Sequence, residues 1–417
     1  MMGRTVGELR GRDNASPKNG ESYPSKMISS LLTVLLALSV SACDIRARDV
    51  NGKSRQIPVP VKTDDGWDVA SLDSVGMDPE DFIRLMDRLD RTSEHRIHGI
   101  LVVRNSQLVF EKYYPGPKFN LGQYTGGTGY GRDDLHVLCS ATKSVSSALL
   151  GIALDKDYIQ SIEQKVNDFF PEHADLFLQE PAKGNLTIKH LLTMTSGLTY
   201  DDESLPYTNP NNDMHRFFTA GDPIRFLLAK PLFSEPGTVF DYDNCNTNIF
   251  GQIIRKAANK RLDVFAKEYL FDKIGVARQE WQPVRNDVVL CSGDLHLRPR
   301  DMAKFGQLFL NRGEWNGERI ISSAWCDLST AAFLKPNSYT AEFPWADGYG
   351  YHWWQKTFVR HAGNQAAYFA FGWGGQMIMI VPDLSLVIVT TAGNWFGAEK
   401  ISPFSIVSDY IFPSLNR

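Results

Sequence analysis

Several features that mark particular classes of protein are missing from this 417-residue chain. Its formal net charge is −4, and no basic run with interleaved aromatic residues is present, so nothing predicts a nucleic-acid partner. Its five cysteines and nine histidines show no zinc-ligand spacing, so we expect neither a metal nor a cofactor. The Gly-x-Ser-x-Gly and His-Glu-x-x-His motifs of two common hydrolase designs are also absent, and no internal repeat is visible. With 43% hydrophobic and 22% charged residues, the composition is that of an ordinary globular protein.

Long hydrophobic runs are scarce, and the one clear apolar run lies near the N-terminus. Residues 27–42 are too few for a membrane span and end in small residues, as signal peptides do. The sequence Val40-Ser-Ala-Cys43 resembles a bacterial lipobox, in which the cysteine is lipidated and becomes the first residue. We therefore expect a signal peptide over residues 1–43, lipidation at Cys43 and a polar tether over 44–70. A plain exported soluble protein is the alternative, and both place a domain of residues 71–417 on the periplasmic face of a bacterial membrane or outside the cell.

The sequence leaves the oligomeric state and the disulfide state open. Outside the signal peptide four cysteines remain, which could pair in an oxidising compartment. We expect them mostly to be small buried residues instead; they are Cys139, Cys245, Cys291 and Cys326.

The most informative segment runs from Ser140 to Lys143, at the predicted start of a buried helix. Positions i and i+3 share a helix face, so the serine and the lysine can touch. A serine hydroxyl needs an adjacent base before it becomes a good nucleophile, and a buried lysine in its neutral form can be that base. The helix N-terminus also favours developing negative charge. The alternative is a chance Ser-x-x-Lys match in an ordinary buried helix.

A second segment offers a proton donor for a leaving group. Tyr242 and Asn244 follow a Pro-Gly turn and precede a predicted helix, so phenol and amide can be aimed in one direction. A core tyrosine with a satisfied hydroxyl is the alternative for Tyr242. A rival Tyr-x-Asn begins at Tyr207, but it precedes no clear helix and we interpret Tyr207 as a loop residue.

A third segment, residues 370–376, is rich in glycine and leads into a predicted hairpin. Glycine lets the backbone approach a substrate closely, so an N–H group near Gly372 and Trp373 could complete an oxyanion hole with that of Ser140. A glycine-rich turn without function is the alternative. From their nearness to these motifs, Tyr200, Tyr207 and Trp373 are expected to shape the acyl pocket.

The predicted elements suggest one sheet built from both ends of the chain. A helix is expected from Asp78, a hairpin over residues 99–114 turning at Asn105-Ser106, and a loop over the glycine-rich residues 122–131. A mainly helical region over about 150–310 is followed by a hairpin over 376–391 and a helix over about 403–411. The fold class is therefore α+β, with an antiparallel sheet, flanking helices and an inserted helical subdomain.

The three segments, in this order, resemble the serine β-lactamase-like family, which includes class C β-lactamases, DD-peptidases, family VIII-type esterases and 6-aminohexanoate-dimer hydrolase. Residues 186–198, 235–244 and 293–306 strengthen the resemblance, which covers about 70–415. It implies a β-lactamase/transpeptidase-like fold, Ser140 as nucleophile, Lys143 as its proton acceptor and Tyr242 as acid/base for the leaving group. Asn244 would be an ancillary polar contact, and Trp373 would donate the oxyanion N–H.

One departure from the family pattern affects the expected substrate. The Lys-Thr-Gly triad that grips a substrate carboxylate in lactamases and peptidases is replaced by Ala370, Phe371 and Gly372, and Trp373 follows. The sequence therefore favours a covalent serine hydrolase of small esters or amides with an apolar acyl part. A β-lactamase or DD-peptidase is one alternative, and a catalytically silent envelope protein that binds peptidoglycan or a partner is the other.

Overall fold

The computed structural model describes residues 56–93, 95–120, 123–285, 287–333, 343–360, 363–395 and 401–415. The predicted signal peptide, Cys43 and the first part of the predicted tether lie outside these residues. Within the described residues, no helix combines the length and the apolar character needed to cross a membrane.

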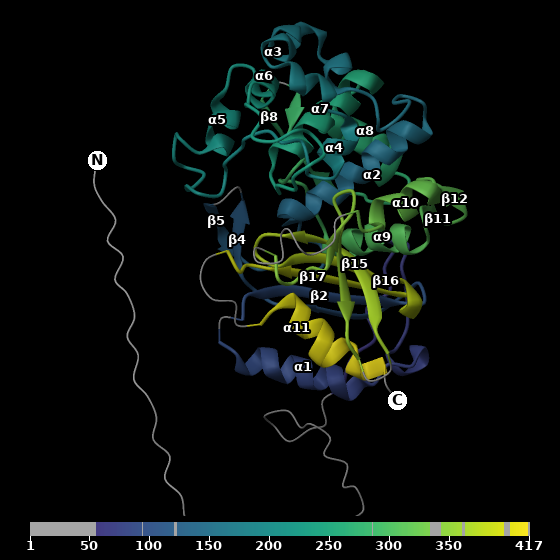
Figure 1. Cartoon of the computed structure of the whole chain (residues 1–417). Coiled ribbons are helices and arrows are strands. Elements are labelled where there is room, and N and C mark those ends of the chain that lie inside the picture. The colour runs from purple at the N-terminus through teal and green to yellow at the C-terminus, as the bar shows by residue number, and fades with distance from the viewer. Residues whose placement is uncertain are drawn as a thin grey trace, which may run out of the picture. The chain divides into compact units, whose positions relative to one another are not determined.

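An eight-stranded sheet made from both ends of the chain forms the centre of the described structure (Figure 1). Strand β2 of the early hairpin pairs antiparallel with β17 of the late hairpin, which confirms the sheet predicted from the sequence. The sheet is mixed rather than wholly antiparallel, because β1 runs parallel to β3 at one edge. In order across the sheet, the strands are β1 (Asp68–Val69), β3 (Gln107–Tyr113), β2 (Ile97–Arg104), β17 (Leu386–Ala392), β16 (Gln376–Val381), β15 (Gln365–Gly372), β14 (Trp354–Phe358) and β13 (Gly348–Tyr349).

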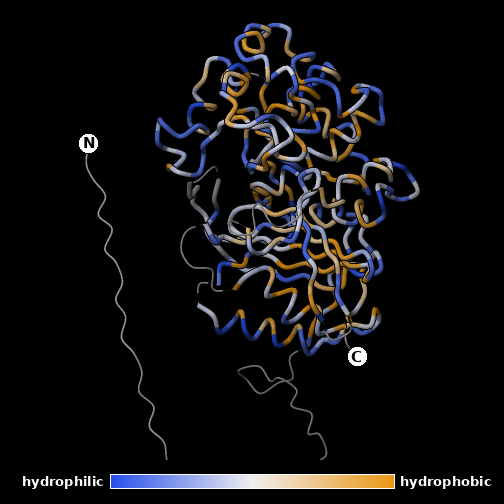
Figure 2. The backbone as a smooth tube through the Cα atoms, viewed as in Figure 1, coloured by the Kyte–Doolittle hydropathy of each residue, from blue (hydrophilic) through white to orange (hydrophobic). Residues whose placement is uncertain are grey.

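Both faces of this sheet are buried, so its central strands are continuous apolar runs. Side chains alternate between faces along a strand, and in β17 Leu386 and Ile388 enter one core while Val387 and Val389 enter the other. Figure 2 shows the resulting concentration of hydrophobic residues in the central strands.

Helices cover the two faces. Helix α1 (Pro79–Arg91), capped by Asp78 as predicted, shares one core with α11 (Pro403–Ile406) and the π-helical turn Val407–Ile411. The other face carries α9 (Pro299–Leu310) and packs toward α2 (Thr142–Asp155) and α10 (Ser323–Thr330). A Cβ at Gly306 of α9 would lie 2.5 Å from Val387 Cγ1, so this glycine allows the helix to lie directly on β17.

The predicted helical region extends away from the α9 face of the sheet (Figure 1). Its further helices are α3 (Ala174–Gln179), α4 (Ile188–Leu192), α5 (Asp213–Thr219), α6 (Pro223–Leu228), α7 (Cys245–Ala258) and α8 (Leu262–Ala266), which continues into a π-helical turn at Lys267–Phe271. In one small sheet β10 (His296–Leu297) lies between β6 (His136–Val137) and β7 (Gln279–Glu280). Two others pair β8 (Pro283–Arg285) with β9 (Val288–Val289) and β11 (Glu314–Trp315) with β12 (Glu318–Arg319).

Two expectations need comment. The loop predicted over residues 122–131 is wrong for most of its length, because β5 (Gln123–Thr128) pairs antiparallel with β4 (Pro117–Asn120). Glycines can take part in main-chain pairing, but they give no alternation of polar and apolar side chains from which a strand could be predicted.

The described end of the predicted tether packs against the domain. Trp67 is buried and donates to the Arg300 carbonyl oxygen, while the Arg300 guanidinium donates to the Val61 carbonyl oxygen.

A buried histidine pair connects β2 with the segment that leads to Ser140. His98 Nδ1 and His136 Nε2 lie 3.0 Å apart, and His136 Nδ1 lies 3.0 Å from the Val137 carbonyl oxygen. Because a carbonyl only accepts, His136 carries its proton on Nδ1 and His98 donates from Nδ1. Burial, the largest cause, lowers the pKa of His98 to about 3 and that of His136 to about 4.

This pair should make the protein less stable in acid. The unfolded histidines take up protons as the pH falls through about 6.5, whereas the folded ones stay neutral until about pH 4, so the free energy of unfolding decreases across that window. His136→Gln is expected to reduce the pH slope of that free energy by about 1.4 kcal/mol per pH unit. Urea unfolding between pH 4.5 and 7.5 checks this, and an unchanged slope would contradict it.

Candidate active site

Ser140 and Lys143 lie at the start of α2, as the helical spacing predicts. Ser140 occupies a 3₁₀ turn, Cys139–Ala141, and α2 continues directly from it. Lys143 Nζ lies 3.0 Å from Ser140 Oγ, and the lysine side chain is buried, with 1% of its surface exposed. The serine immediately follows Cys139, which has a positive φ of 46°, so the chain turns sharply into the helix at this point.

The partners of Lys143 determine what its amine can do. Its Nζ donates to Asn244 Oδ1 at 2.7 Å and to the Ser292 carbonyl oxygen at 3.3 Å. Both oxygens only accept, so a neutral amine uses its two N–H groups on them. Its lone pair is then left for the hydroxyl proton of Ser140.

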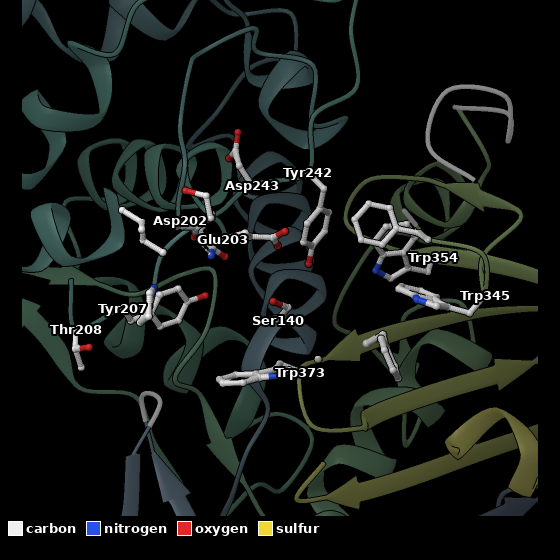
Figure 3. Close-up of a pocket in the computed structure, with 17 residues that line it drawn as sticks. Ser140, Asp202, Glu203, Tyr207, Thr208, Tyr242, Asp243, Trp345, Trp354 and Trp373 are labelled. Carbon is white, nitrogen blue, oxygen red and sulfur yellow. Dashed lines mark hydrogen bonds between the residues drawn. The ribbon is translucent and has the colours of Figure 1, made fainter. Parts of the chain in front are cut away.

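Tyr242 and Asn244 reach the same place from the start of α7, which begins after Asn244 as predicted. The Tyr242 ring centroid lies 4.8 Å from Lys143 Nζ, and Figure 3 shows its hydroxyl pointing toward Ser140. A tyrosine so placed can pass a proton between the serine side of the cavity and a leaving group.

Gly372, the last residue of β15, packs against the turn that carries Ser140. A Cβ at this position would lie 2.2 Å from the Leu138 carbonyl oxygen and 3.0 Å from the Ala141 nitrogen, so no larger residue fits without displacing that turn. The main chain of Trp373, the next residue, is thereby brought beside Ser140. The Trp373 ring lines the cavity and is 42% exposed.

These residues border a cavity of about 800 Å³ (Figure 3). One wall is aromatic: Tyr242 packs against Trp354, with ring centroids 5.3 Å apart, and Trp354 packs against Trp345 at 4.7 Å. Figure 3 shows Tyr207 on the opposite side of Ser140 from Trp345. The lining residues are Ser140, Asp202, Glu203, Ser204, Leu205, Pro206, Tyr207, Thr208, Tyr242, Asp243, Asn244, Phe343, Trp345, Trp354, Phe371, Gly372 and Trp373.

The charged residues on the described lining are all acidic. Burial raises the pKa of Asp202 to about 6, with the hydrogen bond from Asn244 and the charge of Lys143 acting in the opposite direction. Burial also raises the pKa of Asp243, whose carboxylate accepts from the side chain and main-chain N–H of Asn246. The described lining therefore offers no arginine, lysine or histidine to a substrate carboxylate.

Sequence reasoning missed Asp202 and most of the aromatic wall, and it was partly wrong about the pocket tyrosines. Tyr207 does line the cavity, but Tyr200 is buried beside Met214 and does not. The spacing of a Ser-x-x-Lys motif in a helix predicts that its two side chains are neighbours. Asp202 lies in an irregular loop between α4 and α5, where no local sequence pattern predicts which residues it contacts.

The remaining side-chain expectations concern cysteines and metals. Cys245, Cys291 and Cys326 are buried free thiols, and Cys139 is a partly buried one, in agreement with the expectation. Over the ranges that the structure describes, no group of three or more histidine, cysteine, aspartate or glutamate side chains is placed to hold a metal ion.

Comparison with known proteins gives the family. Residues 82–398 match the family described as Beta-lactamase. The chain is 24% identical over 339 residues to the 6-aminohexanoate-dimer hydrolase of Paenarthrobacter ureafaciens, covering 76% of this chain and 79% of that protein. Among solved structures, a family VIII carboxylesterase superposes with a TM-score of 0.60 at 17% identity, covering 86% of this chain and 99% of that one. A penicillin-binding protein homologue from Caulobacter crescentus superposes with a TM-score of 0.57 at 17% identity, covering 76% and 93%.

The structural similarities, at these identities, support the fold. The matched residues include every segment described above around the cavity: the start of α2 with Ser140 and Lys143, the segment before α7 with Tyr242, and the end of β15 with Gly372. This chain belongs to the β-lactamase family and has its serine-hydrolase fold.

Proposed function

We propose that this protein hydrolyses small esters or amides through a covalent acyl-enzyme on Ser140. The observation that carries the proposal is the position of Lys143 Nζ, 3.0 Å from Ser140 Oγ and bonded on its other side to the acceptor Oδ1 of Asn244. A lysine held in this way can accept the serine proton as the hydroxyl oxygen attacks a carbonyl carbon.

The remaining steps use residues that border the same cavity. As Ser140 Oγ bonds to the carbonyl carbon, the oxygen of that carbonyl gains negative charge, which the main-chain N–H groups of Ser140 and Trp373 would stabilise. Tyr242 would deliver a proton to the leaving oxygen or nitrogen as its bond to carbon breaks. Lys143 would then return the serine proton to Tyr242. Water would attack the acyl-enzyme and lose a proton to the neutral lysine, which would pass that proton to Ser140 Oγ as the acid is released.

The cavity supports an uncharged or cationic substrate with an apolar part. Its aromatic wall can bury a hydrocarbon group, and the acidic side chains of Asp202 and Glu203 disfavour a substrate carboxylate when they are ionised. The similar 6-aminohexanoate-dimer hydrolase and family VIII carboxylesterase have names that denote amide and ester cleavage. The acidic lining, rather than these names, favours the ester or amide hydrolase over the β-lactamase or DD-peptidase alternative, whose substrates carry a carboxylate.

A substrate pair that differs in one charge tests the proposal. We expect a pre-steady-state burst of p-nitrophenol from p-nitrophenyl butyrate, and a kcat/KM at least about tenfold higher for this ester than for the p-nitrophenyl monoester of succinate. A tenfold ratio corresponds to about 1.4 kcal/mol. Faster turnover of a chromogenic cephalosporin than of either ester would favour the β-lactamase alternative. Absence of any burst or turnover would favour the silent binding protein.

We also propose that the domain is exported and held at the periplasmic face of the membrane by a lipid on Cys43. The support is the apolar run at 27–42 and the lipobox-like sequence that follows it. Incorporation of labelled palmitate by the full chain but not by its Cys43→Ser variant is the expected result, and equal labelling of both would reject it.

A further inference from the structure

Asp202 is a buried carboxylate that the catalytic scheme above does not use. Only 3% of its surface is exposed, although it lies in the loop between α4 and α5. Its Oδ2 accepts a hydrogen bond from Asn244 Nδ2.

The side chain of Asn212 fixes the loop that carries Asp202 by hydrogen bonds to its main chain. Asn212 Nδ2 donates to the carbonyl oxygens of Asp202 at 2.9 Å and Leu205 at 2.7 Å. The Asn212 Oδ1 accepts from the Met214 N–H at 2.7 Å and so caps α5. These hydrogen bonds fix the main chain around Asp202, so the position of its carboxylate is defined although it lies in a loop.

The hydrogen bond to Asp202 decides which way the Asn244 amide faces. An ionised carboxylate can only accept, so the amide must turn its NH₂ group toward Asp202 and its Oδ1 toward Lys143. If the amide reversed, its NH₂ group would face the lysine. The lone pair of a neutral Lys143 could then accept from Asn244 instead of from Ser140, and the lysine would lose an acceptor for one N–H.

We propose that Asp202 is a positioning residue that locks the Asn244 amide in the orientation that reserves the lone pair of Lys143 for Ser140. This inference rests on the proposed function, because it concerns the same nucleophile and base. Asp202 acts through Asn244, and it touches neither Ser140 nor Lys143 by a hydrogen bond in the described structure.

Protonation of Asp202 should allow the Asn244 amide to adopt either orientation. A neutral carboxyl can donate as well as accept, so it no longer forces the amide to present its NH₂ group. Burial raises the pKa of Asp202 to about 6, and the correct orientation is therefore enforced above that pH and weakened as the pH falls through it. The charged and titratable groups that interact with Asp202 are Lys143, Glu203, Asp243, Cys245, Tyr200 and Tyr207.

Two substitutions at Asp202 separate its role as an acceptor from its charge. Asp202→Asn keeps an oxygen that can accept from Asn244 but adds an NH₂ group that can donate, so it resembles the protonated carboxyl and does not titrate. Asp202→Leu has a similar size and no acceptor. The measurement is the acylation rate with p-nitrophenyl butyrate from pH 4.5 to 9. For Asp202→Leu we expect acylation to fall about 10²-fold with little change in KM, because the reacting groups are misaligned. For Asp202→Asn we expect acylation at pH 7.5 to show the smaller loss that protonation of Asp202 causes in the parent, up to about tenfold, with no further decline near pH 6.

The pH profile distinguishes positioning from a purely structural role. A carboxylate that only supports the loop would lower the rate without changing the shape of the profile, so a decline near pH 6 that persists in Asp202→Asn would overturn the inference. Acylation by Asp202→Leu at the parental rate would also overturn it. If Asp202→Leu does not fold, the profile of Asp202→Asn alone decides.

The test also separates this inference from the proposed function. If the parent protein forms no acyl-enzyme, or if its burst survives Ser140→Ala, the proposed function itself is wrong. If the parental burst depends on Ser140 while the Asp202 variants acylate normally, only the positioning role is rejected.

Discussion

Ser140→Ala is expected to remove nearly all turnover, on the order of 10³-fold or more, because the substitution removes the hydroxyl oxygen that would form the proposed acyl-enzyme. The burst of p-nitrophenol should disappear together with the steady-state rate. Rapid mixing of enzyme with p-nitrophenyl butyrate measures both. Mass spectrometry of acid-quenched protein should show an added butyryl group in the parent and none in the variant.

Ser147→Ala is the matched control for that substitution. Ser147 lies in the same helix, is fully buried and belongs to no part of the site described above. Its hydroxyl has no hydrogen-bond partner among the described residues, so its loss should leave the burst close to the parental one. Equal losses of activity in both variants would mean that damage to α2, and not loss of the nucleophile, explains the effect of Ser140→Ala.

Lys143→Met should give the second large effect, a fall in acylation of about 10³-fold with substrate binding largely retained. Methionine has a similar length but no basic nitrogen, so the substitution removes the proton acceptor while filling most of the same space. Single-turnover acylation rates compared with the KM for p-nitrophenyl butyrate separate the two effects. A burst of normal rate in this variant would assign the base to another residue, with Tyr242 the nearest candidate.

Lys183→Met controls for the loss of a buried lysine as such. Lys183 is 4% exposed, donates to the Leu228 carbonyl oxygen at 3.0 Å and pairs with Glu180, away from the cavity. This variant should lose stability, because it leaves a buried acceptor without its donor, but it should keep the parental acylation rate per folded molecule. Inactivation equal to that of Lys143→Met would remove the case for Lys143 as the base.

The sequence predicts those parts of the site whose geometry is local. Ser140 and Lys143 are three residues apart at the start of a helix, and helix geometry alone brings their side chains to 3.0 Å. The early hairpin could be predicted for a similar reason: the turn residues Asn105 and Ser106 both have positive φ, which suits a two-residue hairpin turn. The segment with β5 was not recognised, because glycine-rich strands carry little side-chain pattern.

The tertiary structure alone decided which distant segments meet around Ser140. Asn244 reaches Lys143 across 101 residues of sequence, and Asp202 reaches Asn244 across 42. The contact of Gly372 with the Leu138–Ala141 turn likewise depends on where β15 lies in the sheet. These contacts arise because burying the apolar faces of the sheet and helices fixes the segments relative to one another, and no local pattern records that arrangement. The sequence by itself thus determined the Ser140–Lys143 contact and the family resemblance, whereas packing of distant described segments determined the orientation of Asn244, the aromatic wall and the acidic lining of the cavity.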